Sequence, residues 1–190
     1  MAKAGERIDC PSPYARSLVF STTSRDSDGQ VLEMEAIFQA ENELPPDHYH
    51  PIQAERFEVL EGELLTRIDG HDRVYAAGES FDVSPGVRHQ MTNTNSEIAT
   101  RMLWRLTPAL RTETLFETFF GLARDGKTNE RGVPALLHAA LLLREYRDEI
   151  RIASPPAFVQ GPLFALVAPL ARAFGYRTWY PEYSPSEGRP

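Results

Sequence analysis

The chain has 190 residues, 42% of them hydrophobic and 25% charged, which is an ordinary composition for a soluble globular protein. Its formal net charge of −7 and its pI of about 5.3 argue against a general affinity for nucleic acid or for anionic membrane surfaces. The single cysteine, Cys10, excludes an intrachain disulfide.

We expect neither a signal peptide nor a membrane-spanning segment in this sequence. The N-terminal residues lack the apolar core of a signal peptide. The longest apolar run, residues 163–171, is much shorter than the roughly 20 residues that cross a bilayer as a helix. These features predict a cytoplasmic protein without a transmembrane segment.

The N-terminal part of the chain has the patterns of β-strands. Residues 1–16 have few apolar positions and predict an irregular lead-in. Residues 18–23 are rich in β-forming side chains, and polar and apolar residues partly alternate over 31–40, so both stretches are predicted strands. The polar, glycine-containing segment 24–29 predicts the hairpin turn between them. Further short strands are predicted at residues 64–68, 74–77, 80–83 and 98–107.

After Pro108 the apolar residues recur at helical spacing. A first helix is predicted at 112–124, and a second at 134–152 with a charged, solvated second half. A third, strongly apolar helix is predicted at 161–174, with a kink at Pro169.

Two histidines precede a carboxylate in the middle of the predicted strands. In an extended strand residues i and i+2 point to the same face, so His48 and His50 are expected to lie side by side. The four residues after His50, Pro51 among them, are enough to turn the chain and bring in Glu55 from the next strand. Two neutral imidazoles and a carboxylate suit a divalent transition metal ion.

A second segment supplies a further ligand-type residue. Gly78 begins a short strand, Pro85 and Gly86 form a turn, and His89 opens the next strand, followed four residues later by Asn93. A lone pair of histidines would be a weak signal for a metal. Four ligand-type residues, each in a suitable strand or turn, form a strong one.

Together the two segments resemble the paired motifs of the cupin superfamily, of the single-domain, conserved-barrel type. The pattern departs from the family at Asn42, where a glycine is expected, and at Ser84, where a proline is expected and Pro85 follows one place later. The resemblance implies a small antiparallel β-barrel, or jelly roll, with one metal ion inside. It also implies the four metal ligands, His48, His50, Glu55 and His89.

The predicted fold is mainly β and has two zones. Residues 1–107 are expected to form the cupin barrel, and residues 108–190 a helical extension of two to three helices. The first zone holds 18 acidic and 10 basic side chains and the second 9 and 10, so the acidity lies in the barrel. We expect the helices to pack on the barrel or across a homodimer interface; a lid, a partner surface or a membrane-surface contact are the alternatives.

The expected cofactor is one divalent transition metal ion, namely Fe, Ni, Mn, Zn or Cu. Four protein ligands in a six-coordinate geometry leave two positions for water, dioxygen or a bidentate organic ligand. The leading hypothesis is a dioxygenase-like oxidoreductase acting on a small organic molecule. In some dioxygenases of the superfamily the equivalent carboxylate also acts as a base, so the resemblance makes Glu55 the candidate catalytic residue. A metal-dependent isomerase, hydrolase or decarboxylase, and a non-enzymatic ligand-binding cupin, are the alternatives.

Overall fold

The computed structural model describes residues 2–10, 17–39, 44–93, 95, 97–130 and 132–184. Asn42 and residues 11–16 of the predicted lead-in lie outside the described residues. Three helices follow the main run of strands: α1 (Thr112–Arg124), α2 (Leu136–Glu145) and α3 (Ala157–Ala173). The strands are β1 (Arg7–Asp9), β2 (Ser17–Thr22), β3 (Leu32–Phe38), β4 (His48–Tyr49), β5 (Ala54–Glu61), β6 (Glu63–Ile68), β7 (His71–Ala76), β8 (Ser80–Val83), β9 (His89–Thr92), β10 (Thr100–Thr107) and β11 (Arg151–Ile152).

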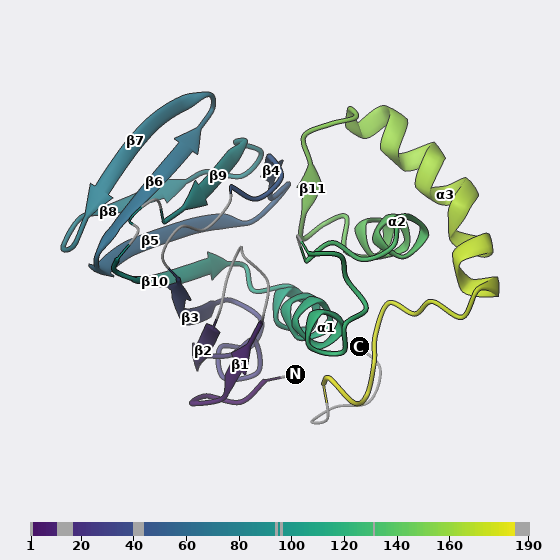
Figure 1. The fold of residues 1–190 in the computed structure, drawn as a ribbon, viewed down its shortest axis with the longest axis horizontal. Helices are drawn as coiled ribbons and strands as arrows, with labels where there is room; N and C mark the ends of the chain where they lie inside the picture. The colour runs from purple at the N-terminus through teal and green to yellow at the C-terminus, as the bar shows by residue number, and fades with distance from the viewer. Residues whose placement is uncertain are drawn as a thin grey trace.

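The strands form two antiparallel sheets that enclose the core (Figure 1). One sheet has the order β1-β2-β3-β10-β5-β8 and the other the order β11-β4-β9-β6-β7. Alternate residues of each strand point inward, as the period of two requires. The enclosed side chains include Phe20, Leu32, Met34, Phe57, Val59, Leu64, Met91 and Met102. The prediction of a mainly β, antiparallel fold is confirmed.

The predicted hairpin between β2 and β3 is present, and the two strands pair antiparallel. Its turn contains Asp28 and Gly29, whose φ angles of 51° and 79° are accessible at low cost to few residue types. The irregular lead-in is wrong in part, because Arg7–Asp9 pairs with β2 as an edge strand. That pairing uses backbone hydrogen bonds and few apolar side chains, so no hydropathy pattern marks it.

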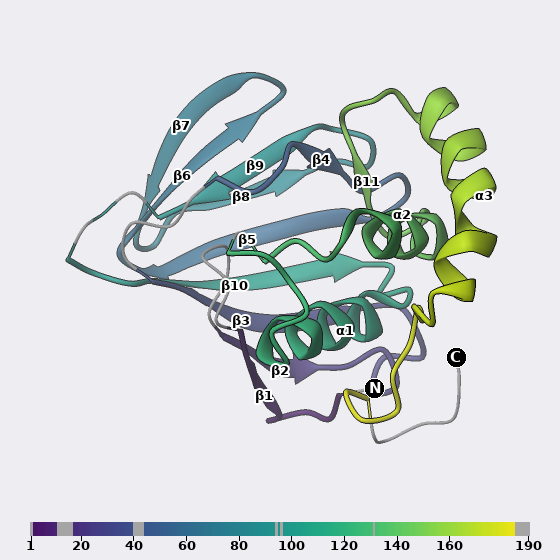
Figure 2. The same ribbon diagram turned by 45° about the vertical axis from the view of Figure 1, so that its right-hand side comes forward.

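Helix α1 has the bounds that the sequence predicts, and it lies beside β1 and β2 (Figure 2). Phe120 and Ala123 join the core cluster of the barrel. Phe116 packs on Trp104 of β10, with the ring centroids 5.2 Å apart. The apolar stripe of α1 therefore packs against the barrel.

The prediction of one helix over 134–152 is wrong in its second half. Helix α2 ends at Glu145, and the chain returns to the barrel as β11, which pairs with β4. Two side chains beyond the helix are buried: the Tyr146 hydroxyl donates to the carbonyl of Thr178, and Glu149 pairs with Arg111. These tertiary contacts outweigh the local helix propensity of the charged segment.

Helix α3 begins four residues before the predicted start at Gly161, so Pro162 and Pro169 both lie inside it. Its inner side is buried, and Ala168 and Ala171 pack against Leu141 of α2. Its outer side lies at the edge of the molecule (Figure 2). Large apolar side chains are exposed there, namely Phe158, Val159, Leu163, Leu166, Leu170 and Phe174. Among the described residues, no helix combines the length and apolar character needed to span a membrane.

One acidic side chain of α1 is buried against the β2–β3 turn. Glu113 has no exposed surface, and one of its oxygens accepts a hydrogen bond from the backbone N–H of Ser24. The other oxygen has no hydrogen-bond partner among the described residues. Burial, together with the nearby Glu117, raises the pKa of Glu113 to about 7. At neutral pH this carboxyl group therefore opposes folding when it ionises.

The substitution Glu113→Gln should remove this cost. The pKa of Glu113 is about 7 in the folded protein against an ordinary 4.5, so the folded state holds the proton more tightly and stability falls as pH rises between these values. Because the hydrogen bond from Ser24 offsets part of the cost of ionisation, we expect the variant at pH 8 to gain of the order of 1 kcal/mol, or about 2–4 °C in Tm. Thermal unfolding at pH 5 and pH 8 measures this. Glu58→Gln, at an exposed position of β5, is the control; equal pH dependence in wild type and Glu113→Gln would contradict the analysis.

Candidate metal centre

The two sequence motifs meet at one end of the barrel. Strand β4 pairs with β9 so that His48 lies directly opposite His89. His50 follows β4 at the spacing of two that returns a side chain to the same face. The Pro85–Gly86 turn is fixed to this segment, because the N–H of Gly86 donates to the carbonyl of His50 at 2.8 Å. The turn between the motifs therefore holds them in register.

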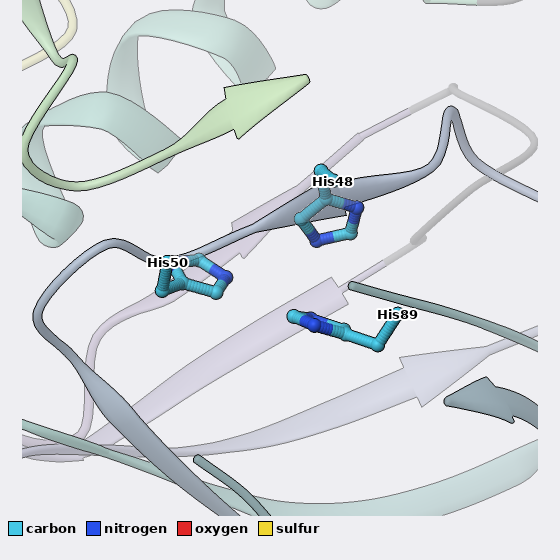
Figure 3. A group of neighbouring side chains, drawn as sticks. All are labelled: His48, His50 and His89. Atoms are coloured by element: carbon cyan, nitrogen blue, oxygen red, sulfur yellow. The ribbon is translucent and has the colours of Figure 1, made fainter. Parts of the chain in front are cut away.

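The three imidazoles point toward one another (Figure 3). One ring nitrogen from each of His48, His50 and His89 lies within 4.8 Å of the others. Glu55 faces the same space from β5: its Oε1 lies 3.4 Å from Nε2 of His50, and its Oε2 lies 3.0 Å from Nε2 of His89. The structure thus brings together all four residues that the sequence singled out. His50, Glu55 and His89 are buried, and His48 is partly exposed as a residue.

Each imidazole is oriented by a main-chain carbonyl group. Nδ1 of His48 lies 2.9 Å from the carbonyl oxygen of Pro46, and Nδ1 of His89 lies 3.1 Å from that of Val87. Nδ1 of His50 lies 2.6 Å from the carbonyl oxygen of Glu149. A carbonyl oxygen only accepts hydrogen bonds, so Nδ1 carries the proton in each neutral ring and Nε2 carries a lone pair. This is the arrangement in which a histidine is held ready to bind a metal ion.

The charges of the group call for a cation. The pKa of His48 is lowered to about 3. The main cause is removal of the imidazole from water, and repulsion by positive charge on His89 and His50 adds to it. Burial disfavours ionisation of Glu55, but His50 and His89 outweigh it and hold the pKa of this carboxyl below its usual range. Nε2 of His50 is buried and has no hydrogen-bond partner within the described part of the chain. Burial opposes a charge on His89, but the hydrogen bond and the charge of Glu55 outweigh it and raise the pKa of this imidazole. Three imidazoles around an ionised carboxylate form a ligand set that suits a divalent transition metal ion.

Trp104 is a member of the site that sequence reasoning missed. Its indole N–H donates to Oε1 of Glu55 at 3.0 Å and leaves Oε2 directed at His89. The ring stacks on Phe57, with the centroids 5.5 Å apart, across the pairing of β10 with β5. A tryptophan in an alternating strand has the sequence signature of a core residue, and nothing in the pattern marks its hydrogen bond.

The C-terminal extension forms one wall of the site, which sequence reasoning also missed. The carbonyl group that orients His50 belongs to Glu149, and β11 pairs Ile152 with His48. The Glu149 side chain accepts from Nε of Arg111 at 2.9 Å, and Nη2 of Arg111 donates to the carbonyl of Glu145 at 2.7 Å. Arg111 therefore clamps the segment whose backbone holds His50.

The interior beside the imidazoles is apolar, as the alternation after Glu55 predicts. Phe57 and Val59 are fully buried on the same face of β5, and Met91 of β9 is 7% exposed. Such a lining removes water from the neighbourhood of the four polar side chains and strengthens their electrostatic interactions.

Comparisons with curated proteins and with solved structures find only distant similarity. Among curated proteins, none is significantly similar to the chain. Three solved structures resemble it at low identity: an RmlC-like cupin from Shewanella frigidimarina (19% identity, 56% of this chain and 86% of that one, TM-score 0.46), the polyketide cyclase RemF from Streptomyces resistomycificus (17%, 56% and 78%, 0.47), and a cupin-superfamily sugar phosphate isomerase from Silicibacter pomeroyi (20%, 54% and 70%, 0.44). Their activities differ, and at this level of similarity none of them transfers to this chain.

The family comparison concerns the segment that carries both motifs. Residues 35–105 match the family model described as a cupin domain. This range runs from within β3 to within β10 and includes the three histidines, Glu55 and Trp104. The chain therefore contains a domain of the cupin superfamily.

Proposed function

We propose that the protein is a metal-binding cupin in which His48, His50, Glu55 and His89 hold one divalent transition metal ion. The observation that carries the proposal is the direction of three Nε2 lone pairs toward one another and toward a buried carboxylate. Without a cation, the charge of Glu55 in this nearly dry interior would be compensated chiefly by the imidazoles of His50 and His89, whose Nε2 atoms lie 3.4 and 3.0 Å from its oxygens. Fe, Ni, Mn, Zn and Cu all accept this ligand set.

We further propose a metal-dependent enzyme that acts on a small organic molecule by dioxygenase-like chemistry. When bound, the metal would supply Lewis acidity and, if it is Fe, Ni, Mn or Cu, a site for dioxygen chemistry. The buried side chains of Phe57, Val59 and Met91 would exclude water from the inner side of the metal centre. Glu55, fixed at Oε1 by Trp104, would present Oε2 either to the metal or to a substrate proton. Its lowered pKa makes the ligand role the stronger of the two.

A cupin that binds a small ligand without turnover is the second candidate. Within the described residues, the three imidazoles and Glu55 contact one another, the backbone carbonyl groups that orient the rings, and the indole of Trp104. An isomerase, hydrolase or decarboxylase needs a general acid or base beyond the four ligands. Low basicity of Glu55 and the absence of such a group among these partners favour binding over non-redox catalysis.

The division of the chain at residues 107 and 108, the homodimer and the cytoplasmic location stay predictions. Contacts of α1 with the barrel core and of β11 with β4 support an extension that packs on the barrel. The exposed apolar side of α3 is compatible with a second copy of the chain.

The metal centre is tested by elemental analysis of untagged protein purified without added metal. We expect about one equivalent of a transition metal in the wild type and almost none in His50→Ala, because the variant removes one imidazole and leaves the Glu149 carbonyl without its donor. His71→Ala, which removes an exposed histidine of β7, is the matched control and should keep the metal. Equal metal content in wild type and His50→Ala would refute the proposed ligand set. Oxygen-uptake assays on the loaded protein then separate dioxygenase chemistry from binding alone.

Arg111 should act as a positioning residue for His50. Arg111→Ala frees the Glu149 segment, so we expect metal affinity to fall by about tenfold while the protein stays folded. Competition with a chromophoric chelator measures the affinity, and the NMR signal of the His50 Nδ1 proton reports whether its hydrogen bond persists. Arg105→Ala breaks the exposed pair with Glu33 and serves as the control. An unchanged affinity, or an unchanged Nδ1 signal, would show that Arg111 does not position His50.

A further inference from the structure

A second polar site lies outside the barrel, between the end of α2, β11 and the first half of α3. A hollow of about 260 Å³ opens there. Arg144, Arg147 and Arg151 line it from one side, and Gln160 and Phe164 of α3 from the other. No carboxylate is among its lining residues, all of which lie in the described part of the chain.

The three guanidinium groups are poorly neutralised. Arg147 has a carboxylate neighbour only at the limit of an ion pair, with its Nε 4.0 Å from Asp148. Nε of Arg151 donates to the carbonyl of Arg147, which leaves its terminal N–H groups available. The Arg144 side chain has no hydrogen-bond or ion-pair partner among the described residues. In addition, the sequence contains no acidic residue from 150 to 181. Three positive charges therefore face one small space in a protein whose net charge is −7.

The walls of the hollow are tied together. Gln160 is 5% exposed, and its amide group donates to the carbonyl of Ile152 at 2.8 Å and to that of Pro155. Arg151 belongs to β11, which is paired with β4 of the barrel. The backbone segments on the two sides of the hollow are thus fixed to each other and to the sheet, so the three arginines project from a fixed frame.

We propose that this hollow binds a phosphate monoester with a small apolar group. The planar guanidinium group can donate two parallel hydrogen bonds to two oxygens of a phosphate. Three guanidinium groups carry more positive charge than one carboxylate would neutralise, so a phosphate dianion is the better match. Leu143, Ala157 and Phe164 supply an apolar wall for the organic part. A volume of about 260 Å³ corresponds to roughly eight or nine water-sized groups, enough for a phosphate and a few carbon atoms.

The same chemistry occurs in a soluble metabolite and in the headgroup of phosphatidic acid. The second source is relevant because α3, which forms one wall of the hollow, exposes Phe158, Leu166 and Phe174 on its outer side. A soluble ester would use the hollow alone. A lipid would use the hollow for its headgroup and the outer side of α3 for contact with the acyl region.

Calorimetric titration of the full-length protein with butyl phosphate at low ionic strength tests the site. We expect saturable one-to-one binding that is tighter than that of inorganic phosphate, because only the ester uses the apolar wall. Arg144→Gln and Arg151→Gln should each weaken it by about tenfold. Arg73→Gln, which changes the net charge equally at an exposed position of β7, should leave it unchanged. Measuring the same titration in the His50→Ala background separates this site from phosphate bound at the metal centre.

Sedimentation with phosphatidylcholine vesicles, with and without phosphatidic acid, identifies the source. Sedimentation that needs phosphatidic acid and is lost in Arg151→Gln assigns the site to the lipid headgroup; binding of butyl phosphate without sedimentation assigns it to a soluble ester. The proposal is overturned if butyl phosphate does not bind, if the arginine variants match Arg73→Gln, or if binding disappears in His50→Ala. The last of these results would assign phosphate binding to the metal centre and not to the hollow.

Discussion

The hydrogen bonds from the three imidazoles to main-chain carbonyl groups are the constraint on which the centre depends. Their acceptors are Pro46 before β4, Val87 in the turn before β9, and Glu149 after α2. Each bond selects the tautomer that leaves Nε2 free, so the chemistry of the site is set by backbone positions in three separate segments. The barrel supplies two of these acceptors and the C-terminal extension the third. A shift of any one segment would turn a ring and remove a lone pair from the common point.

This dependence gives the extension a role beyond covering the barrel. Arg111, just before α1, bonds to the side chain of Glu149 and to the backbone of Glu145. Without that clamp the carbonyl of Glu149 could withdraw, and the buried Nδ1–H of His50 would lose its acceptor, at a cost of about 1–3 kcal/mol. The ion pair between Arg111 and Glu149 and the pairing of β11 with β4 thus both help to hold the imidazole of His50 in its orientation.

The sequence predicted those parts of the molecule that follow from local periodicity. The spacing of His48, His50 and Glu55 is a strand spacing interrupted by a turn, and α1 has a regular apolar stripe, so both were predictable. The parts that were missed depend on contacts between distant segments. The end of α2 is decided by the burial of Tyr146 and Glu149, and β1 is an edge strand held by backbone pairing.

The missed members of the site show the same limit. The hydrogen-bond acceptor for His50 is the backbone carbonyl of Glu149. Every residue has such a carbonyl, so no sequence motif identifies it. Trp104 is a side chain that the sequence does show, but its role depends on the hydrogen bond that its indole N–H donates to Glu55, which is 49 residues away in the sequence. Patterns of side chains can identify ligands, whereas the groups that orient ligands are found only when the chain is folded.

Strand β11 joins the two sites at a short distance along the chain. Arg151 lines the arginine hollow and pairs with Tyr49, while the next residue, Ile152, pairs with His48. A ligand that holds the Arg151 side chain also restricts β11, and through it β4 with its histidine. Binding free energies that are coupled in this way are reciprocal: a phosphate ester that tightens metal binding must itself bind more tightly when the metal is present. Because β11 and β4 share only two residue pairs, the coupling depends on few hydrogen bonds, and its size reports how firmly the extension is attached to the barrel.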